Sequence, residues 1–325
     1  MSYQGPGFDV PQSERPRRFR RGLLTVSLAA LVPGALLGWL VYEAVGEPGG
    51  GPDTAAPPSA TGSPSASEEP ALPSHPGQAG KGAGRSPART PSASAPAASG
   101  PLKGKVVVID PGHNPGNFRH TAEINRPVDI GTNRKECDTT GTSTNAGYAE
   151  ARFTLDVAHR LRALLEAEGA TVKLTHDGDS PAWGPCVDER ARIGNDAHAD
   201  AVVSIHADGA APGDRGFHVI LPGAVHAGTA DTRPIVAASR DLGERIAGNF
   251  VRVTGEAPSN YLGGGTGLVT RKDLGGLNLS TVPKVFIECG NMRDSKDAAS
   301  LTSADWRQKA AEGISEGIVS FLRGS

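Results

Sequence analysis

Val106-Val107-Val108-Ile109-Asp110-Pro111-Gly112-His113 is the stretch that decides the fold of this chain. Its first four residues are apolar and β-branched, which is typical of a buried strand. The proline and the glycine end this strand and turn the chain sharply. The strand therefore delivers His113 to its carboxyl end, where open α/β sheets place their functional sites.

Two later strands end in a similar way. Residues 201–208 read Ala-Val-Val-Ser-Ile-His-Ala-Asp, so a second buried strand carries His206 near its end. Residues 285–291 read Val-Phe-Ile-Glu-Cys-Gly-Asn, and this third strand carries Glu288. Because histidine and carboxylate side chains are the usual ligands of a catalytic metal, the pattern indicates a metal hydrolase.

Helical and strand-like segments alternate over the last two thirds of the chain. The apolar periodicity predicts helices over 150–168, 187–197, 232–254 and 303–322, and further strands over 171–174 and 217–221. This alternation predicts an α/β fold: a three-layer αβα domain with a mostly parallel, twisted sheet over residues 104–325. The long polar segment 114–148 is expected to be functional or to carry a small hairpin.

The first part of the chain has a different composition. Arginines cluster near the end of segment 1–21, and the uncharged apolar segment 22–42 follows them. As a helix that segment is about 31 Å long, which is enough to span a bilayer. We therefore expect a basic cytoplasmic tail, a single-pass anchor and a folded domain outside the membrane. A cleaved signal peptide, followed by secretion, is the alternative.

Residues 43–103 are dominated by Pro, Ala, Gly and Ser. Such a composition buries too little apolar surface to fold, so we expect a disordered linker. The formal net charge is -2, and residues 104–325 contain no basic cluster. Nucleic acid is therefore not an expected partner, and we expect a monomer.

The chain has three cysteines, which fit an exported protein. Cys137 and Cys186 lie in polar loops, and we expect them to form a disulfide. Cys289 lies inside a buried strand, where we expect a free thiol. Three free thiols are the alternative.

A zinc site for hydrolysis needs three protein ligands and one open position. His113 and His206 supply two of the ligands, and Glu150 supplies the third because it opens a helix that packs beside the first strand. Glu123 and Glu136, in the long polar segment, are the competing ligands.

Three further carboxylates lie close to these residues. We expect Asp110 to orient an imidazole as a hydrogen-bond acceptor, and Asp208 to cap a turn. Glu288 ends an apolar strand, where burial raises the pKa of a carboxyl group toward neutrality. It can then take a proton from water and pass it to a leaving amine. A buried ion pair with Arg190 or Arg271 is the alternative role for Glu288.

Taken in order, Asp-Pro-Gly-His, a helix opened by glutamate, Ser-Ile-His-Ala-Asp and Glu-x-Gly-Asn resemble the zinc-dependent N-acetylmuramoyl-L-alanine amidases of the type 3 amidase family. The resemblance covers nearly all of 104–325. It implies that His113, Glu150 and His206 hold Zn²⁺ and that Glu288 is catalytic. It also implies cleavage of the amide between N-acetylmuramic acid and L-alanine in peptidoglycan or its muropeptide fragments.

Segments 145–148 and 184–190 resemble a single-domain, disulfide-bearing branch of that family. In that branch the two cysteines bridge, and the segment after the first histidine forms a hairpin near the active site. Thr154 departs from the pattern, because many members have asparagine there. With the anchor, this resemblance implies a catalytic domain that faces the cell wall from the outer side of the membrane.

Substrate contacts are expected from the Gly-rich segment before the last strand. They are also expected from the residue that follows Gly290 in that strand. The candidates are Arg271, Asp273, Asn278 and Asn291. A non-catalytic peptidoglycan-binding module of the same fold, or a zinc peptidase or deacetylase, is the alternative function.

Overall fold

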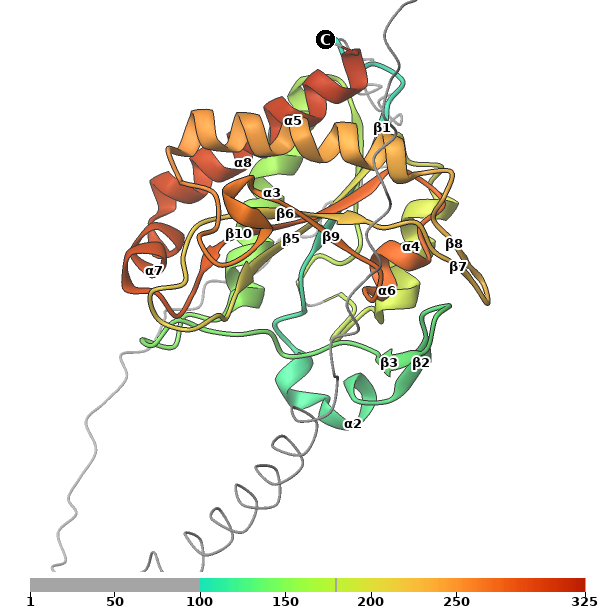
Figure 1. Ribbon diagram of the computed structural model, residues 1–325, viewed down its shortest axis with the longest axis horizontal. Helices are drawn as coiled ribbons and strands as arrows, with labels where there is room; N and C mark the ends of the chain where they lie inside the picture. The colour runs from blue at the N-terminus through green and yellow to red at the C-terminus, as the bar shows by residue number, and fades with distance from the viewer. Residues whose placement is uncertain (1–99, 179, 325) are drawn as a thin grey trace, which may run out of the picture. The chain divides into compact units, whose positions relative to one another are not determined.

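The computed structural model describes residues 100–178 and 180–324 (Figure 1). The predicted cytoplasmic tail and anchor, and all but the last residues of the predicted linker, lie outside these residues. Within them, no helix has the length and apolar character needed to cross a membrane.

A six-stranded sheet forms the centre of the domain, with the order β4-β1-β5-β10-β6-β9. Its strands are β1 (Val106–Pro111), β4 (Thr171–Leu174), β5 (Ala201–Asp208), β6 (His218–Pro222), β9 (Leu268–Arg271) and β10 (Lys284–Asn291). Only β10 and β6 are antiparallel among the neighbouring strands of this sheet. The predicted mostly parallel sheet is therefore confirmed, with β9 as an additional strand.

Helices cover both faces of the sheet unequally. Three long helices, α3 (Glu150–Ala167), α5 (Val236–Thr254) and α8 (Ala304–Arg323), pack on one face, and α7 (Ser295–Thr302) adjoins α8. The shorter α4 (Val187–Asp196) and α6 (Gly275–Asn278) pack together away from them (Figure 1). The three predicted layers are present.

The side chains of β5 alternate between the two faces of the sheet, and this alternation places the candidate ligand on one of them. Val203, Ile205 and Ala207 join the main core, which also contains apolar residues of α3, α5 and α8. Val202 faces the other way, into a small cluster beside α4. Because side chains alternate along a strand, His206 shares this second face, so the polar residues lie opposite the large core.

The long segment after β1 contains short elements, including the expected hairpin. They are η1 (Asn117–Arg119), α2 (Thr121–Ile124), β2 (Pro127–Asp129) and β3 (Arg134–Glu136), the last two paired as antiparallel strands. The predicted Cys137–Cys186 disulfide joins the end of this hairpin to the start of α4. Cys289 is a free, buried thiol, as predicted.

The helix predicted from residue 232 begins at Val236 instead. Arg233 precedes Pro234, and a residue before proline avoids the helical region. The Thr232 hydroxyl donates to the carbonyl of Gly223 and accepts from the amide of Val225, so this residue closes a turn. That turn leads out of the small hairpin β7 (His226–Ala227) and β8 (Ala230–Asp231).

Candidate metal centre

His113, Glu150 and His206 meet at the carboxyl edge of the sheet. Nε2 of His113 lies 3.2 Å from Oε1 of Glu150, and Nδ1 of His206 lies 3.0 Å from the same oxygen. One candidate ligand atom from each residue lies within 4.8 Å of the other two. The structure therefore brings together the three residues that the sequence predicts as metal ligands.

The turn after β1 fits tightly against His206. A Cβ atom on Gly112 would lie 2.4 Å from Cε1 of the His206 ring, so only glycine fits there. The amide of Gly112 donates to the carbonyl of Ile205 at 2.9 Å. His113 follows with a φ of 61°, a left-handed conformation that non-glycine residues rarely adopt. The turn thus points one histidine toward the other.

Glu150 is held in place by the backbone around it. It is buried and is the first residue of α3. Its Oε2 accepts from the amide of Thr142 at 2.9 Å, and its Oε1 accepts from the amide of Ala207 at 3.2 Å. One helical turn later, the hydroxyl of Thr154 donates to the carbonyl of Gly112 at 2.7 Å. The threonine at this position therefore fastens α3 to the histidine turn.

Each histidine has its second ring nitrogen fixed. Nδ1 of His113 lies 3.1 Å from the carbonyl oxygen of Thr139 and 3.5 Å from Oδ1 of Asp138. Nε2 of His206 lies 3.2 Å from the hydroxyl of Ser204, which donates to Oδ2 of Asp110 at 2.9 Å. These contacts leave Nε2 of His113 and Nδ1 of His206 facing Glu150. Asp110 therefore orients His206 indirectly, through Ser204.

Two buried cations hold the carboxylates behind the histidines. The Arg190 guanidinium donates to Oδ1 of Asp110 at 2.8 Å and to Oδ2 of Asp138 at 2.9 Å. Nζ of Lys284, fully buried, lies 3.1 Å from Oδ2 of Asp110. Burial opposes the charge on Asp110, but Lys284 and Arg190 outweigh it and hold the pKa of that carboxyl far below its usual value. Since Arg190 binds these two aspartates, the alternative ion pair between Arg190 and Glu288 is wrong.

Glu288 lies beside the three candidate ligands. Its Cα is paired with that of His206 in the parallel register of β10 and β5. It lines a cavity of about 320 Å³ together with His113, Glu150 and His206. Its Oε2 is buried and has no hydrogen-bond partner among the described residues. Burial, and then the negative charges of Glu150 and Asp208, raise the pKa of Glu288 well above its usual value.

The centre has an excess of negative charge. Burial disfavours a charge on His113, but Glu150 and Asp138 outweigh this and raise the pKa of His113 to about 10. A group of carboxylates that stabilises an imidazolium to this extent will also stabilise a metal cation in its place. The electrostatics therefore suit a divalent ion at these ligands.

Neither competing ligand belongs to the group of candidate ligand atoms, although Glu136 lines a cavity that also contains His113. Glu123 contacts Nδ1 of His120 at 3.4 Å, and Glu136 is exposed on the hairpin. Asp208, for which a turn cap was expected, ends β5 and lines the cavity that contains Glu288. Its Oδ1 accepts from the amide of Gly209 at 2.6 Å, and its Oδ2 accepts from the hydroxyl of Tyr261 at 2.7 Å.

The four predicted substrate contacts separate into two pairs. Arg271 lines the cavity that contains Glu288, and Asp273 lines an adjoining cavity of about 250 Å³ that reaches His113. These two side chains bind each other, with Nε of Arg271 donating to Oδ1 of Asp273 at 2.8 Å. Lys135 of the hairpin also lies 3.2 Å from Asp273.

Asn278 and Asn291 require a correction, since both are buried and neither lines a cavity that contains His113. The Asn278 amide donates to the carbonyl of Lys272 at 3.0 Å, and the Asn291 amide donates to the carbonyl of Ala211 at 3.0 Å. Their amide groups stabilise neighbouring loops instead of facing a substrate.

The remaining residues of the centre were not predicted. Lys284 carries a signal, because a lysine beside an apolar strand needs a buried partner. Ser204 alternates with His206 on its strand, which places both on one face. Asp138 carries no comparable signal, because its position depends on how the hairpin folds back.

Comparisons with known proteins agree with this geometry. The sequence profile of a family described as N-acetylmuramoyl-L-alanine amidase matches residues 107–320. The N-acetylmuramoyl-L-alanine amidase Rv3717 of Mycobacterium tuberculosis is 41% identical over 234 residues, which are 70% of this chain and 91% of that protein.

Solved structures give the same result. The N-acetylmuramyl-L-alanine amidase Ami1 from Mycobacterium smegmatis superimposes with a TM-score of 0.62 at 38% identity, covering 70% of this chain and 100% of that one. Ami1 from Mycobacterium abscessus gives a TM-score of 0.60 at 38% identity, covering 68% and 100%.

Proposed function

This chain belongs to the N-acetylmuramoyl-L-alanine amidase family, and on that basis we propose that it hydrolyses the amide bond between N-acetylmuramic acid and L-alanine in peptidoglycan or its fragments. The observation that carries the proposal is the group of His113, Glu150 and His206 beside a buried, unpaired Glu288 oxygen. The family profile and the relatives confirm the resemblance drawn from the sequence motifs.

The donor set fits zinc. Two imidazole nitrogens and one carboxylate are a common set for a catalytic zinc ion, and both imidazoles have their other nitrogen fixed by hydrogen bonds. Zinc held by these residues would supply positive charge that polarises a carbonyl group and lowers the pKa of a water molecule.

Glu288 is the proposed general base and acid. Its buried Oε2 makes no hydrogen bond to any residue in the described part of the chain, so this oxygen is free to accept a proton from the attacking water. Its raised pKa then lets the protonated carboxyl donate to the amine of L-alanine as the amide breaks. One residue thus performs both proton transfers.

We also propose that the enzyme works on the outer side of the cell membrane, facing the wall. Support comes from the sequence, in which basic residues of 1–21 precede the apolar stretch 22–42, and from a disulfide, which needs an oxidising compartment. Fractionation of cells that express the full chain tests the location. A processed protein in the culture medium would favour secretion after signal cleavage.

The mechanism is tested by Glu288→Gln. We expect the variant to retain zinc and to lose at least about 100-fold in turnover, because the isosteric amide cannot accept the proton. Glu244→Gln, at an exposed position of α5, is the matched control and should behave like the wild type. Loss of zinc from the Glu288 variant would make Glu288 a ligand, and full activity would exclude it as the base.

Mass spectrometry of the digested muropeptide identifies the bond that opens. Release of an intact stem peptide with a free L-alanine amine supports the amidase. A cut within the peptide or the loss of acetate would indicate the peptidase or deacetylase, and no change in mass would indicate the binding module.

A further inference from the structure

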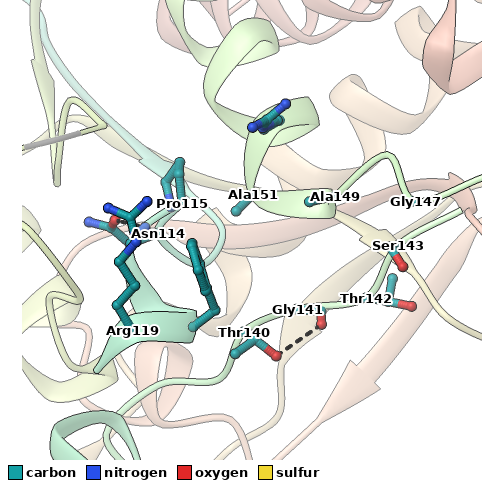
Figure 2. A pocket seen from close by; sticks show the side chains of 13 residues that line it. Asn114, Pro115, Arg119, Thr140, Gly141, Thr142, Ser143, Gly147, Ala149 and Ala151 are labelled. Atoms are coloured by element: carbon teal, nitrogen blue, oxygen red, sulfur yellow. Dashed lines mark hydrogen bonds between the residues drawn. The ribbon is translucent and has the colours of Figure 1, made fainter. Parts of the chain in front are cut away.

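A third cavity, larger than the two described above, adjoins the metal centre. This groove has a volume of about 780 Å³ (Figure 2). Gly141 and Thr142 line both the groove and the smaller cavity that contains Glu288. The backbone of these two residues therefore forms a boundary that the two spaces share.

This shared boundary lies close to the candidate ligands. A Cβ atom on Gly141 would lie 2.7 Å from Cδ2 of His113 and 2.8 Å from Oε2 of Glu150. The amide of Thr142 donates to Glu150. A substrate whose scissile amide lies at the metal ligands can therefore extend past Gly141 directly into the groove.

Two chain segments form the sides of the groove, and the first turn of α3 forms its floor. Figure 2 shows Asn114, Pro115 and Arg119, from the segment after His113, on one side. The extended segment 140–143 forms the other side, and the first turn of α3 closes the groove between them.

The groove is positively charged. Arg119 and Arg152 line it, and no aspartate or glutamate does. Both arginines are exposed, and neither lies within ion-pair distance of a carboxylate over residues 100–178 and 180–324. Phe118, 61% exposed, lies beside them, with the Arg119 guanidinium 4.9 Å from the centre of its ring.

The cavity that contains Glu288 differs from the groove in its charged residues. Arg271 lines the Glu288 cavity, but Asp273 binds its guanidinium through two contacts. An anionic ligand group therefore gains little on the Arg271 side, whereas the Arg119 and Arg152 side offers two cations without carboxylate partners.

We propose that this groove binds the stem peptide of the substrate, with peptide carboxylates at Arg119 and Arg152, and that the glycan extends over the Arg271 side. The inference rests on the proposed function. It specifies the orientation of the substrate at the metal centre, with the peptide toward the groove and the glycan toward Arg271. The lactyl carboxyl group of the glycan is consumed in the scissile amide, so the sugar is neutral there, whereas the peptide retains free carboxylates. Guanidinium groups bind carboxylates through paired hydrogen bonds, and the exposed Phe118 ring offers contact to apolar side chains of the peptide.

The test compares two compounds. One is an N-acetylmuramoyl-tripeptide with free carboxylates, and the other is the same compound with those carboxylates converted to amides. For Arg119→Gln and Arg152→Gln we expect kcat/KM on the free acid to fall by about 10-fold each, mainly through KM. Hydrolysis of the amidated compound should be unchanged.

Controls separate recognition from folding. Arg240→Gln, at an exposed position of α5, should hydrolyse both compounds like the wild type. Arg119→Lys and Arg152→Lys should lose less kcat/KM on the free acid than the glutamine variants. Lysine keeps the positive charge but lacks the paired donors of the planar guanidinium group. The melting temperature of each variant should match that of the wild type.

Binding distinguishes this inference from the proposed function. In a Glu288→Gln background, calorimetry should show tighter binding of the free acid than of the amidated compound, and the preference should disappear with both arginines replaced. If this preference is present but the wild type releases no amine, the proposed activity fails and the groove assignment stands. Equal losses on both compounds, or no loss in the double variant, would overturn the assignment.

Discussion

The hydroxyl of Ser204 lies 3.2 Å from Nε2 of His206, on the side of the ring opposite to the nitrogen that faces Glu150. Because this hydroxyl donates onward to Asp110, it accepts from the imidazole and fixes the tautomer. Nδ1 is then left unprotonated for a metal ion.

Ser204→Ala should therefore weaken zinc binding, by about 10- to 100-fold as for other residues that orient metal ligands. Zinc titration with a competing chelator measures the affinity directly. Ser295→Ala, exposed at the start of α7, is the control. Unchanged zinc affinity in the Ser204 variant would show that the hydroxyl does not orient the ring.

Gly112→Ala should displace the His206 ring, since the new methyl group would lie 2.4 Å from Cε1. We expect both zinc affinity and hydrolysis to fall, together with a loss of stability of about 1–3 kcal/mol from overpacking. Gly248→Ala in α5 is the matched control, because nothing lies within 4 Å of its added Cβ. A Gly112 variant with the zinc affinity of the wild type would contradict the close packing described here.

His176 should make the domain sensitive to mild acid. Burial, with the nearby Arg190, lowers the pKa of His176 to about 4 from its usual 6.5. Between pH 6.5 and pH 4, His176 is protonated in the unfolded chain but neutral in the folded chain. The contribution of His176 to stability is therefore fully present above pH 6.5 and is lost as the pH falls toward 4. The loss attributable to His176 is about 3 kcal/mol.

Chemical denaturation at several pH values measures this loss. His176→Gln can still donate to the carbonyl of Pro111 and accept from the amide of Gly178, but it does not titrate. The stability of this variant should depend less on pH between 6.5 and 4. Parallel pH curves for the two proteins would assign the acid sensitivity to other groups.

The disulfide should contribute strongly to stability. Cys137 and Cys186 are separated by 49 positions, and closing a loop of this length stabilises a fold by about 4 kcal/mol in the chain-entropy model. Replacing both cysteines with serine should lower the free energy of unfolding by about this amount, as measured by denaturant titration. Reductant should destabilise the wild type and leave the double variant unaffected.

The sequence was most informative where a strand ends. A β-branched run followed by Pro-Gly predicts both the strand β1 and the place of His113, and the alternation on β5 does the same for His206. The helix opened by Glu150 then identifies the third ligand. These signals are local, because one strand or helix end fixes where each side chain goes.

Features that depend on contacts between distant segments were harder to predict. The short strand β9 is only partly buried, so it lacks an apolar pattern. Asn278 lies in the Gly-rich segment before the last strand and Asn291 in the Glu-x-Gly-Asn motif, but sequence alone does not show whether an amide faces a cavity or a loop carbonyl. The two groove arginines become neighbours only after the segment beyond His113 folds against α3.

Arg190 also bears on how the site forms during synthesis. This single guanidinium binds both Asp110, which reaches His206 through Ser204, and Asp138, which lies beside His113. Neither imidazole is therefore fully oriented until α4 has docked, and Glu288 leaves the ribosome later still. Metal loading is accordingly expected as a late event in biogenesis, after synthesis of nearly the whole domain, so a truncated or stalled chain should fail to capture zinc tightly.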